Sequence, residues 1–217
     1  MSIDPKSGSP AHDRQWFIVS RWQQYEGEAR ANLLRIVGIA SFYIIEMINR
    51  GGKIGTLELP KTSDDRFHAS VTALSVAWTM VALVTLVCLR RQFFPAAMKF
   101  VTTACDLVLL TAVLTIADGP RSPLIVVYFL IIALAALRLN LPLMWMTTLG
   151  SMAGYLFLVG YADYWASADR ADLIRVPRYY QLIVLVALAL AGVVLGQVIR
   201  RVRTMAEEFS RRTGARD

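Results

Sequence analysis

The chain has 217 residues, of which 56% are hydrophobic and 18% are charged, and it carries a formal net charge of +7 at pH 7. About 100 residues lie outside its long apolar runs, in short dispersed pieces that leave no room for a soluble catalytic domain. The two histidines, His12 and His68, lie in a polar tail and at a helix end, which excludes a bis-histidine haem or a histidine-rich metal site. We therefore expect a protein without enzymatic activity or a bound metal.

Residues 1–32 are predicted to form a cytoplasmic tail followed by an amphipathic helix on the membrane surface. We expect no cleavable signal before the first span, because the first thirty residues contain no apolar core. An apolar stripe at helical spacing consists of Ile18, Trp22, Tyr25, Ala29 and Leu33. Charged residues off this stripe are Arg21, Glu26, Glu28 and Arg30. Such a helix either anchors in the interface or is only a solvated helix.

Residues 33–199 are predicted to form six transmembrane helices. Each apolar run has roughly 16 to 23 residues, enough to cross a hydrocarbon core of about 30 Å. The runs lack the period-two alternation of barrel strands and the polar faces of soluble helices, so the fold class is an all-α, polytopic six-helix bundle. The expected spans are Leu33–Ile48, Phe67–Leu89, Lys99–Ala117, Ser122–Leu139, Leu141–Tyr161 and Tyr179–Ile199.

The basic residues predict the orientation of this bundle. With the N-terminus inside, 15 of the 23 Lys and Arg residues lie on the inner side and eight on the outer side. Both termini are therefore expected in the cytoplasm of a bacterium, with the bundle in its inner membrane. The inner positive charge suits contact with anionic lipids and gives no reason to expect nucleic-acid binding.

Asp106 lies near the middle of the third span, where a carboxylate costs about 2.5 kcal/mol or more. We expect it to face the bundle interior. One interpretation is functional, either a proton-responsive group or a hydrogen-bond partner for a ligand. The other is a polar clasp between helices, with Thr102, Thr103 or a hydroxyl of another helix as partner.

Other polar residues of the spans have structural interpretations. Glu46 lies one turn before Arg50, the favourable order for an anchoring ion pair near the outer interface. Arg138 lies in a tight inner turn, from which its side chain can reach the lipid headgroups. Cys88 and Cys105 are expected to be inert thiols, with a redox-sensing pair as the alternative.

Glycine pairs at helix-packing spacing occur in the fifth and sixth spans. They are Gly150 with Gly154, and Gly192 with Gly196. Such pairs let two helix backbones approach closely. The contact can lie within one chain or between two chains.

Residues 200–217 are predicted to continue the sixth helix into the cytoplasm. Apolar residues alternate spacings of three and four along a narrow seam, at Leu195, Val198, Val202, Met205 and Phe209. If the seam is used, two chains pair there and movement of the sixth span is passed inward. The alternative is a helix that frays after an arginine stop signal.

The segment from Cys105 to Asn140 resembles the six-span membrane input domains of bacterial sensor histidine kinases, notably the redox-responsive RegB type and the pilus-regulating PilS type. In that group an aspartate-leucine pair opens an apolar helix, here at Asp106-Leu107, and an outer turn of pattern Gly-Gly-x-x-Asn/Ser-Pro-Phe/Leu follows. Here the turn reads Asp-Gly-Pro-Arg-Ser-Pro-Leu over residues 118–124. Asp118 replaces the first glycine, and Leu124 stands where the RegB type prefers phenylalanine. Because residues 1–217 include no kinase domain, we expect either an input domain separated from its kinase or a free-standing bundle that resembles one.

The resemblance implies quinone sensing at this turn. It offers Gly119, Arg121, Ser122, Pro123 and Leu124 as quinone contacts, with Tyr128 flanking the ring; the alternative is a plain interhelical turn. The leading functional hypothesis is thus a signal-input module that responds to quinone or redox state and acts through the sixth helix. Its partners would be lipids and a second copy of the chain. An accessory subunit docked in a respiratory or photosynthetic complex is the alternative, and a small transporter coupled by Asp106 is the third.

Overall fold

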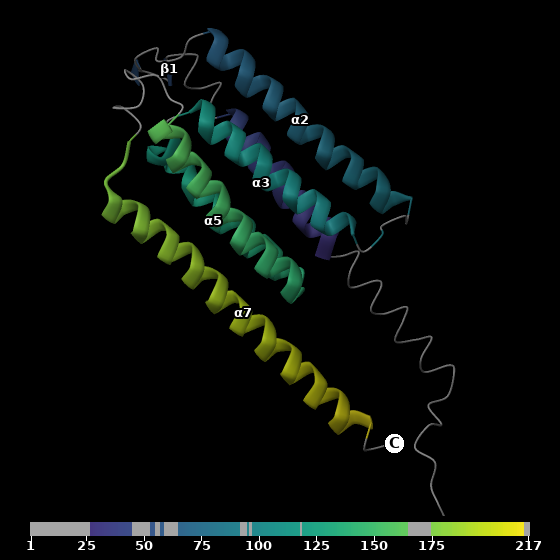
Figure 1. Ribbon diagram of the computed structural model, residues 1–217. Helices are drawn as coiled ribbons and strands as arrows, with labels where there is room; N and C mark the ends of the chain where they lie inside the picture. The colour runs from purple at the N-terminus through teal and green to yellow at the C-terminus, as the bar shows by residue number, and fades with distance from the viewer. Residues whose placement is uncertain are drawn as a thin grey trace, which may run out of the picture.

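The computed structural model describes residues 27–44, 53–54, 57–58, 65–91, 95, 97–117, 119–164 and 175–214 (Figure 1). The first helix covers residues 27–44 and is followed by a short antiparallel pair, β1 (Lys53–Ile54) and β2 (Leu57–Glu58). The remaining helices are α2 (Asp65–Arg90), α3 (Met98–Ile116), α4 (Val126–Leu137), α5 (Leu141–Tyr164) and α7 (Arg178–Gly214).

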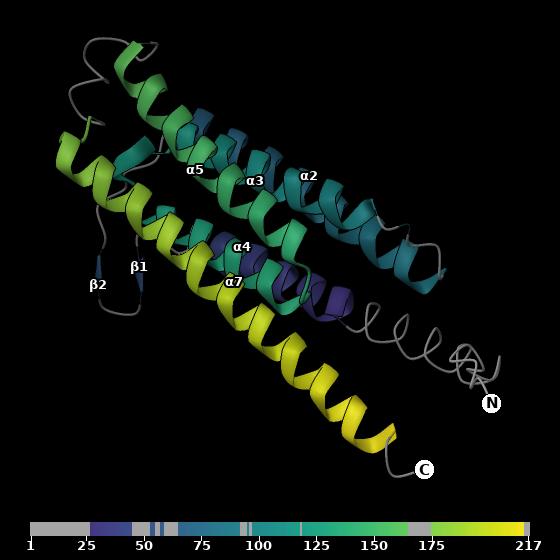
Figure 2. The same cartoon turned by 60° about the horizontal axis from the view of Figure 1, so that its bottom comes forward.

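The helices run up and down along one axis, with β1 and β2 at one end of the bundle (Figures 1 and 2). Within the described residues, four helices are long and apolar enough to cross a membrane, which fits the predicted all-α membrane fold and is fewer than the six spans expected. These segments are Ala69–Arg90, Met98–Ile116, Leu141–Tyr164 and Arg178–Ala206. Pro123–Leu137 is a shorter apolar helix. The strand pair was not predicted, and the expected Glu46–Arg50 pair lies outside the described residues.

Local signals set the two tight turns that flank α4. On the side of β1 and β2, Gly119 has a φ of 57°, a conformation that glycine adopts without steric cost. Ser122 then caps the short 3-10 helix Pro123–Ile125, because its Oγ accepts a hydrogen bond from the Leu124 amide at 3.2 Å. At the other end, Asn140 caps α5 by accepting from the Leu143 amide at 3.0 Å. Each turn thus provides a side-chain oxygen that accepts a hydrogen bond from a backbone amide at the start of the next helix.

The polarity of the bundle is reversed relative to that of a water-soluble protein. Large aliphatic residues such as Val108, Leu149 and Leu182 are exposed on its outside. Its interior holds, besides an apolar core, a set of buried hydroxyl-bearing residues on α3 and α5 such as Thr103, Thr147 and Ser151. Polar residues inside and apolar residues outside are the arrangement that a hydrocarbon solvent favours, because lipid cannot hydrogen-bond to side chains.

Helix α5 packs against α3, α4 and α7, and the glycine pairs lie at these contacts. An added Cβ at Gly154 would come 2.7 Å from Tyr128 Oη, and one at Gly150 would come 2.6 Å from Leu107 Cδ1. On α7, Gly192 faces Thr148 and Gly196 faces Met144. Both pairs therefore allow close approach of helices within one chain.

Helix α7 is continuous over 37 residues, a length of about 55 Å. Its last turns extend beyond the neighbouring helices (Figure 2). Arg203 ties this segment to the bundle, because its Nη2 donates to the Leu139 carbonyl at 2.5 Å. Val198, Val202 and Met205 of the predicted seam are exposed, and the side chain of Phe209 is outside the described set.

We expect Gly192→Ala to destabilise the protein by about 1–3 kcal/mol, because the new methyl group overlaps the Thr148 side chain. Thr148→Ala removes the two nearest atoms and should restore part of this loss in the double variant. Thermal unfolding in detergent measures both. Gly160→Ala is the control, since a Cβ at Gly160 meets nothing within 4 Å. Equal effects of Gly192→Ala and Gly160→Ala would contradict the close α5–α7 contact.

Candidate functional site

The first helix turns its polar face into the bundle. Glu28, Asn32 and Arg35 are 4%, 2% and 6% exposed, and their spacing of four and three residues places them on one face. Ala29 and Leu33 are exposed on the other side. The helix continues unbroken between residues 32 and 33, the predicted boundary at which the amphipathic helix was expected to run into the first span.

This orientation corrects the prediction for Glu28, which was expected among the solvated residues of a surface helix. The prediction considered the apolar stripe alone and assigned the opposite face to water. In the structure the opposite face meets charged and polar partners on α2, α3 and the turn after α4, so burial leaves its residues paired. Ala29 and Leu33 are then left on the outside, where lipid suits them.

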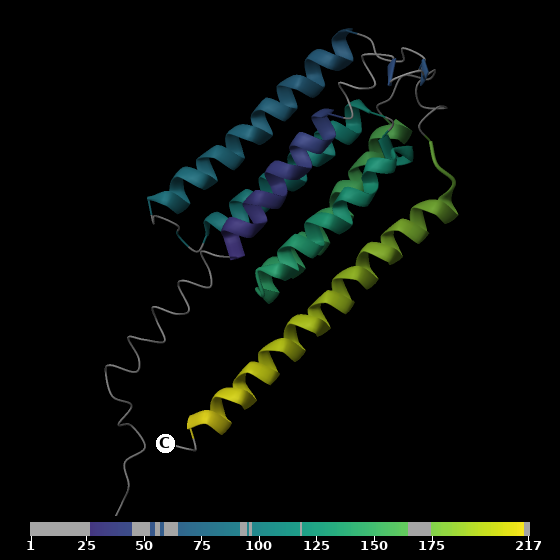
Figure 3. The ribbon, with the colours of Figure 1, turned by 180° about the vertical axis from the view of Figure 1, so that it is seen from behind.

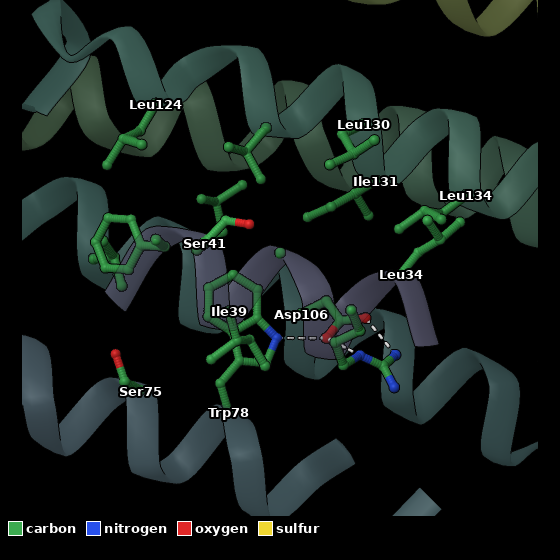
Figure 4. Close-up of a pocket in the computed structure, with 16 residues that line it drawn as sticks. Leu34, Ile39, Ser41, Ser75, Trp78, Asp106, Leu124, Leu130, Ile131 and Leu134 are labelled. Carbon is green, nitrogen blue, oxygen red and sulfur yellow. Dashed lines mark hydrogen bonds and ion pairs between the residues drawn. The ribbon is translucent and has the colours of Figure 1, made fainter. Parts of the chain in front are cut away.

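Asp106 on α3 is the centre of the site. Arg35 binds its carboxylate in the bidentate manner, with Nε donating to Oδ1 at 2.8 Å and Nη2 donating to Oδ2 at 2.5 Å. Trp78 on α2 donates a third hydrogen bond from Nε1 to Oδ1, also at 2.8 Å. Figure 4 shows the carboxylate between these two donors.

The prediction that Thr102 or Thr103 is the partner of Asp106 is therefore wrong. Both hydroxyls instead donate to the Lys99 carbonyl one turn earlier on α3, at 3.2 and 2.8 Å. Such bonds within a helix satisfy a threonine in lipid without another helix. A carboxylate cannot donate to a carbonyl of its own helix, so it needs a partner elsewhere. A guanidinium both balances its charge and donates hydrogen bonds to its oxygens.

Asn32 extends the network to the α2 backbone. Its Oδ1 accepts a hydrogen bond from Arg35 Nη1 at 2.9 Å, and its Nδ2 donates to the Ala82 carbonyl at 3.2 Å. Both the oxygen and the nitrogen of the Asn32 side-chain amide thus have a hydrogen-bond partner. It fixes the Arg35 side chain and joins the first helix to α2 at the same time.

A second ion pair lies nearer the end of the bundle at which the first helix begins. Arg138 Nη2 is 3.0 Å from Glu28 Oε2, although this oxygen accepts no well-aligned hydrogen bond. Arg138 Nη1 donates to Thr103 Oγ1 at 2.8 Å and to the Lys99 carbonyl at 3.3 Å. The prediction that Arg138 reaches outward to headgroups is wrong, because its side chain is only 6% exposed and points to these acceptors. Two anions and two cations therefore balance inside the bundle.

A cavity of about 250 Å³ adjoins the network (Figure 4). The first helix, α2, α3, α4 and the turn before α4 supply its walls. Most of the lining is aliphatic or aromatic, including Leu34, Phe42 and Ile131, and its polar members include Ser75 and Asp106. A second cavity of about 10 Å³ lies between Asp106 and Arg138, which is close to the space that one water molecule needs.

The residues of the predicted quinone set lie around the turn before α4. Gly119 and Ser122 are buried, whereas Arg121 and Pro123 are exposed. Tyr128 is fully buried, with its Oη 2.7 Å from Thr111 Oγ1. Of the six residues, Leu124 alone lines the 250 Å³ cavity formed by the described part of the chain.

Sequence reasoning missed Asn32, Arg35 and Trp78. The spacing of Glu28, Asn32 and Arg35 was a usable signal, because three polar residues on one face of a membrane helix require buried partners. Nothing comparable distinguished Trp78 from the other tryptophans. The described residues also contain no cluster of His, Cys, Asp or Glu side chains able to hold a metal ion.

No protein-family model matches the chain, and no curated protein or solved structure is significantly similar to it.

Breaking the central ion pair is expected to be costly. Arg35→Met and Asp106→Leu should each destabilise the protein by about 3–5 kcal/mol, because each leaves one buried charge without its partner. The double variant should lose much less than the sum of the two, since it buries no charge at this pair. Unfolding of all three variants in detergent gives the coupling energy.

The matched control is the Arg175–Asp163 pair, whose side chains are 52% and 42% exposed at a separation of 3.1 Å. Asp163→Asn should change the stability by less than about 1 kcal/mol, because solvent screens this pair. Additive losses for Arg35→Met and Asp106→Leu would show that the two side chains do not form a coupled pair.

Proposed function

We propose that this chain is a membrane-embedded signal-input module, in which occupancy of the 250 Å³ cavity changes how the first helix sits against the bundle. The observation that carries the proposal is the position of the cavity, between the first helix and the three helices α2, α3 and α4. A ligand there would touch residues next to the Arg35–Asp106 pair. A binding event can shift a conformational equilibrium only through such differential contacts.

The contacts around Arg138 offer a route from the cavity to the end of the bundle. Asp106 and Arg138 border the same small cavity, and Arg138 contacts Glu28 on the first helix. The adjacent residue Leu139 accepts the hydrogen bond from Arg203 on α7. The first helix begins and α7 ends at this same end of the bundle (Figures 1 and 3). An effector on that side would therefore sense both helices.

The proposed topology has six spans and both termini in the cytoplasm of a bacterial inner membrane. It is supported by the excess of basic residues on the predicted inner side and by the alternating direction of the helices. In this topology the ion pairs lie in the inner half of the bilayer, and the β1–β2 pair lies outside. The short helix α4 crosses together with the 3-10 turns that precede it.

The competing hypotheses receive less support from the geometry. Docking as an accessory subunit was favoured by the glycine pairs, which are occupied by contacts within the chain. A transporter coupled by Asp106 needs a carboxylate that can change its charge during transport, and here Arg35 holds both carboxylate oxygens in a buried ion pair. Quinone as the ligand is a further proposal that depends on the resemblance of the turn at residues 118–124.

The topology predicts the outcome of cysteine labelling. With Cys88 and Cys105 replaced, Lys61→Cys should react with an impermeant thiol reagent from outside, and Asp217→Cys only after the membrane is opened. The reason is that an odd number of spans separates these two positions in a six-span protein. Labelling of both from one side would contradict the six-span arrangement.

The proposed function predicts that purification from native membranes yields the chain with a signalling effector, such as a kinase or cyclase. Gly38→Leu fills open space at the cavity and should alter the effector's activity at least twofold, as ligand occupancy would. Gly160→Leu, which also enters open space but does not line the cavity, should leave it unchanged. A stoichiometric complex with cofactor-bearing subunits would contradict the signal-input function and support the accessory role.

A further inference from the structure

We propose that the 250 Å³ cavity binds a neutral, bilayer-dissolved molecule with an apolar body and one hydroxyl group, and that this hydroxyl donates to Asp106. The inference rests on the proposed function and specifies the ligand class of its cavity. It concerns a site formed by the first helix, α2, α3 and α4, which shares only Leu124 with the turn that the resemblance connects with quinone.

The size of the cavity sets the size of the ligand. An apolar cavity of about 150 Å³ holds one benzene molecule. A cavity of about 250 Å³ has room for a body of roughly eight to ten carbon atoms, or for that part of a longer chain. Its aliphatic and aromatic lining, which includes Leu110, Val113 and Leu134, suits such a body.

The exposure of the lining residues shows where a ligand would arrive. Leu34 on the first helix is 42% exposed and Leu130 on α4 is 49% exposed, and both border the cavity. Gly38 and Ser41 of the first helix are exposed beside them. Because these residues lie on the apolar outside of the bundle, the cavity opens toward lipid. The ligand is therefore a molecule that partitions into the bilayer.

The charges beside the cavity decide the polar group of the ligand. Glu28 and Asp106 are balanced by Arg35 and Arg138, so a charged headgroup would add an uncompensated charge to the interior. Asp106 accepts three hydrogen bonds, and a carboxylate offers about four acceptor positions. One position is left for a donor. A neutral hydroxyl satisfies it and brings no charge.

The test compares 1-decanol with decane on the full chain in lipid nanodiscs. Saturating 1-decanol should raise the midpoint of thermal unfolding by about 5 °C, and decane should raise it by less than half as much, because it lacks the hydroxyl. Gly38→Leu should abolish the rise, because Gly38 lines the cavity and a Cβ there meets nothing within 4 Å, which leaves room for the leucine side chain to enter it. Gly160→Leu should retain it in full.

Equal shifts with decane and 1-decanol, or an undiminished shift in Gly38→Leu, would overturn the inference. Failure of this inference is distinguishable from failure of the proposed function. If Gly38→Leu alters the effector but 1-decanol does not bind, the ligand class is wrong and the signalling role stands. If 1-decanol binds at the cavity but neither it nor Gly38→Leu changes the effector, the ligand site stands and the signalling role is wrong.

Discussion

A buried carboxylate needs a partner that balances its charge and fills its hydrogen-bonding positions, and a buried guanidinium needs the same. The Arg35–Asp106 pair meets both needs and thereby fixes the first helix against α3. Asp106 could not remain inside an apolar bundle without a partner. The pair with Arg35 therefore fixes both the position of the first helix along the bundle axis and its rotation about its own axis. Asn32 and Trp78 add donors and acceptors that fit only this arrangement. The position of the first helix therefore follows from electrostatics more than from apolar packing.

The same requirement explains why a cavity can persist beside the ion pair. Three polar residues of the first helix reach α2, α3 and the turn after α4, and these contacts hold the helix toward the end at which it begins. Farther along, the small residues Gly38 and Ser41 line the cavity. A helix held by hydrogen bonds at one end and bordered by open space at the other can change its packing when that space is filled.

These features connect the cavity to the end of the bundle from which α7 extends. The Glu28–Arg138 pair and the bond from Arg203 to Leu139 place the first helix, the turn after α4 and α7 in one set of contacts. The contacts of Gly192 with Thr148 and of Gly196 with Met144 keep α5 and α7 close along the adjoining turns. In the proposed mechanism, α5 and α7 are the fixed part of the bundle and the first helix is the part that responds.

The sequence by itself determined that the chain is helical and apolar enough for a membrane, because the length and continuity of an apolar run are local properties. It also determined that Asp106 faces inward, since a carboxylate has no stable position in lipid. The identity of its partners was decided only by the tertiary structure. Arg35 lies 71 residues from Asp106 and Trp78 lies 28 residues away, and nothing in the local pattern links them. The directions of Glu28 and Arg138 were likewise decided by which opposite charge the folded bundle brought within reach.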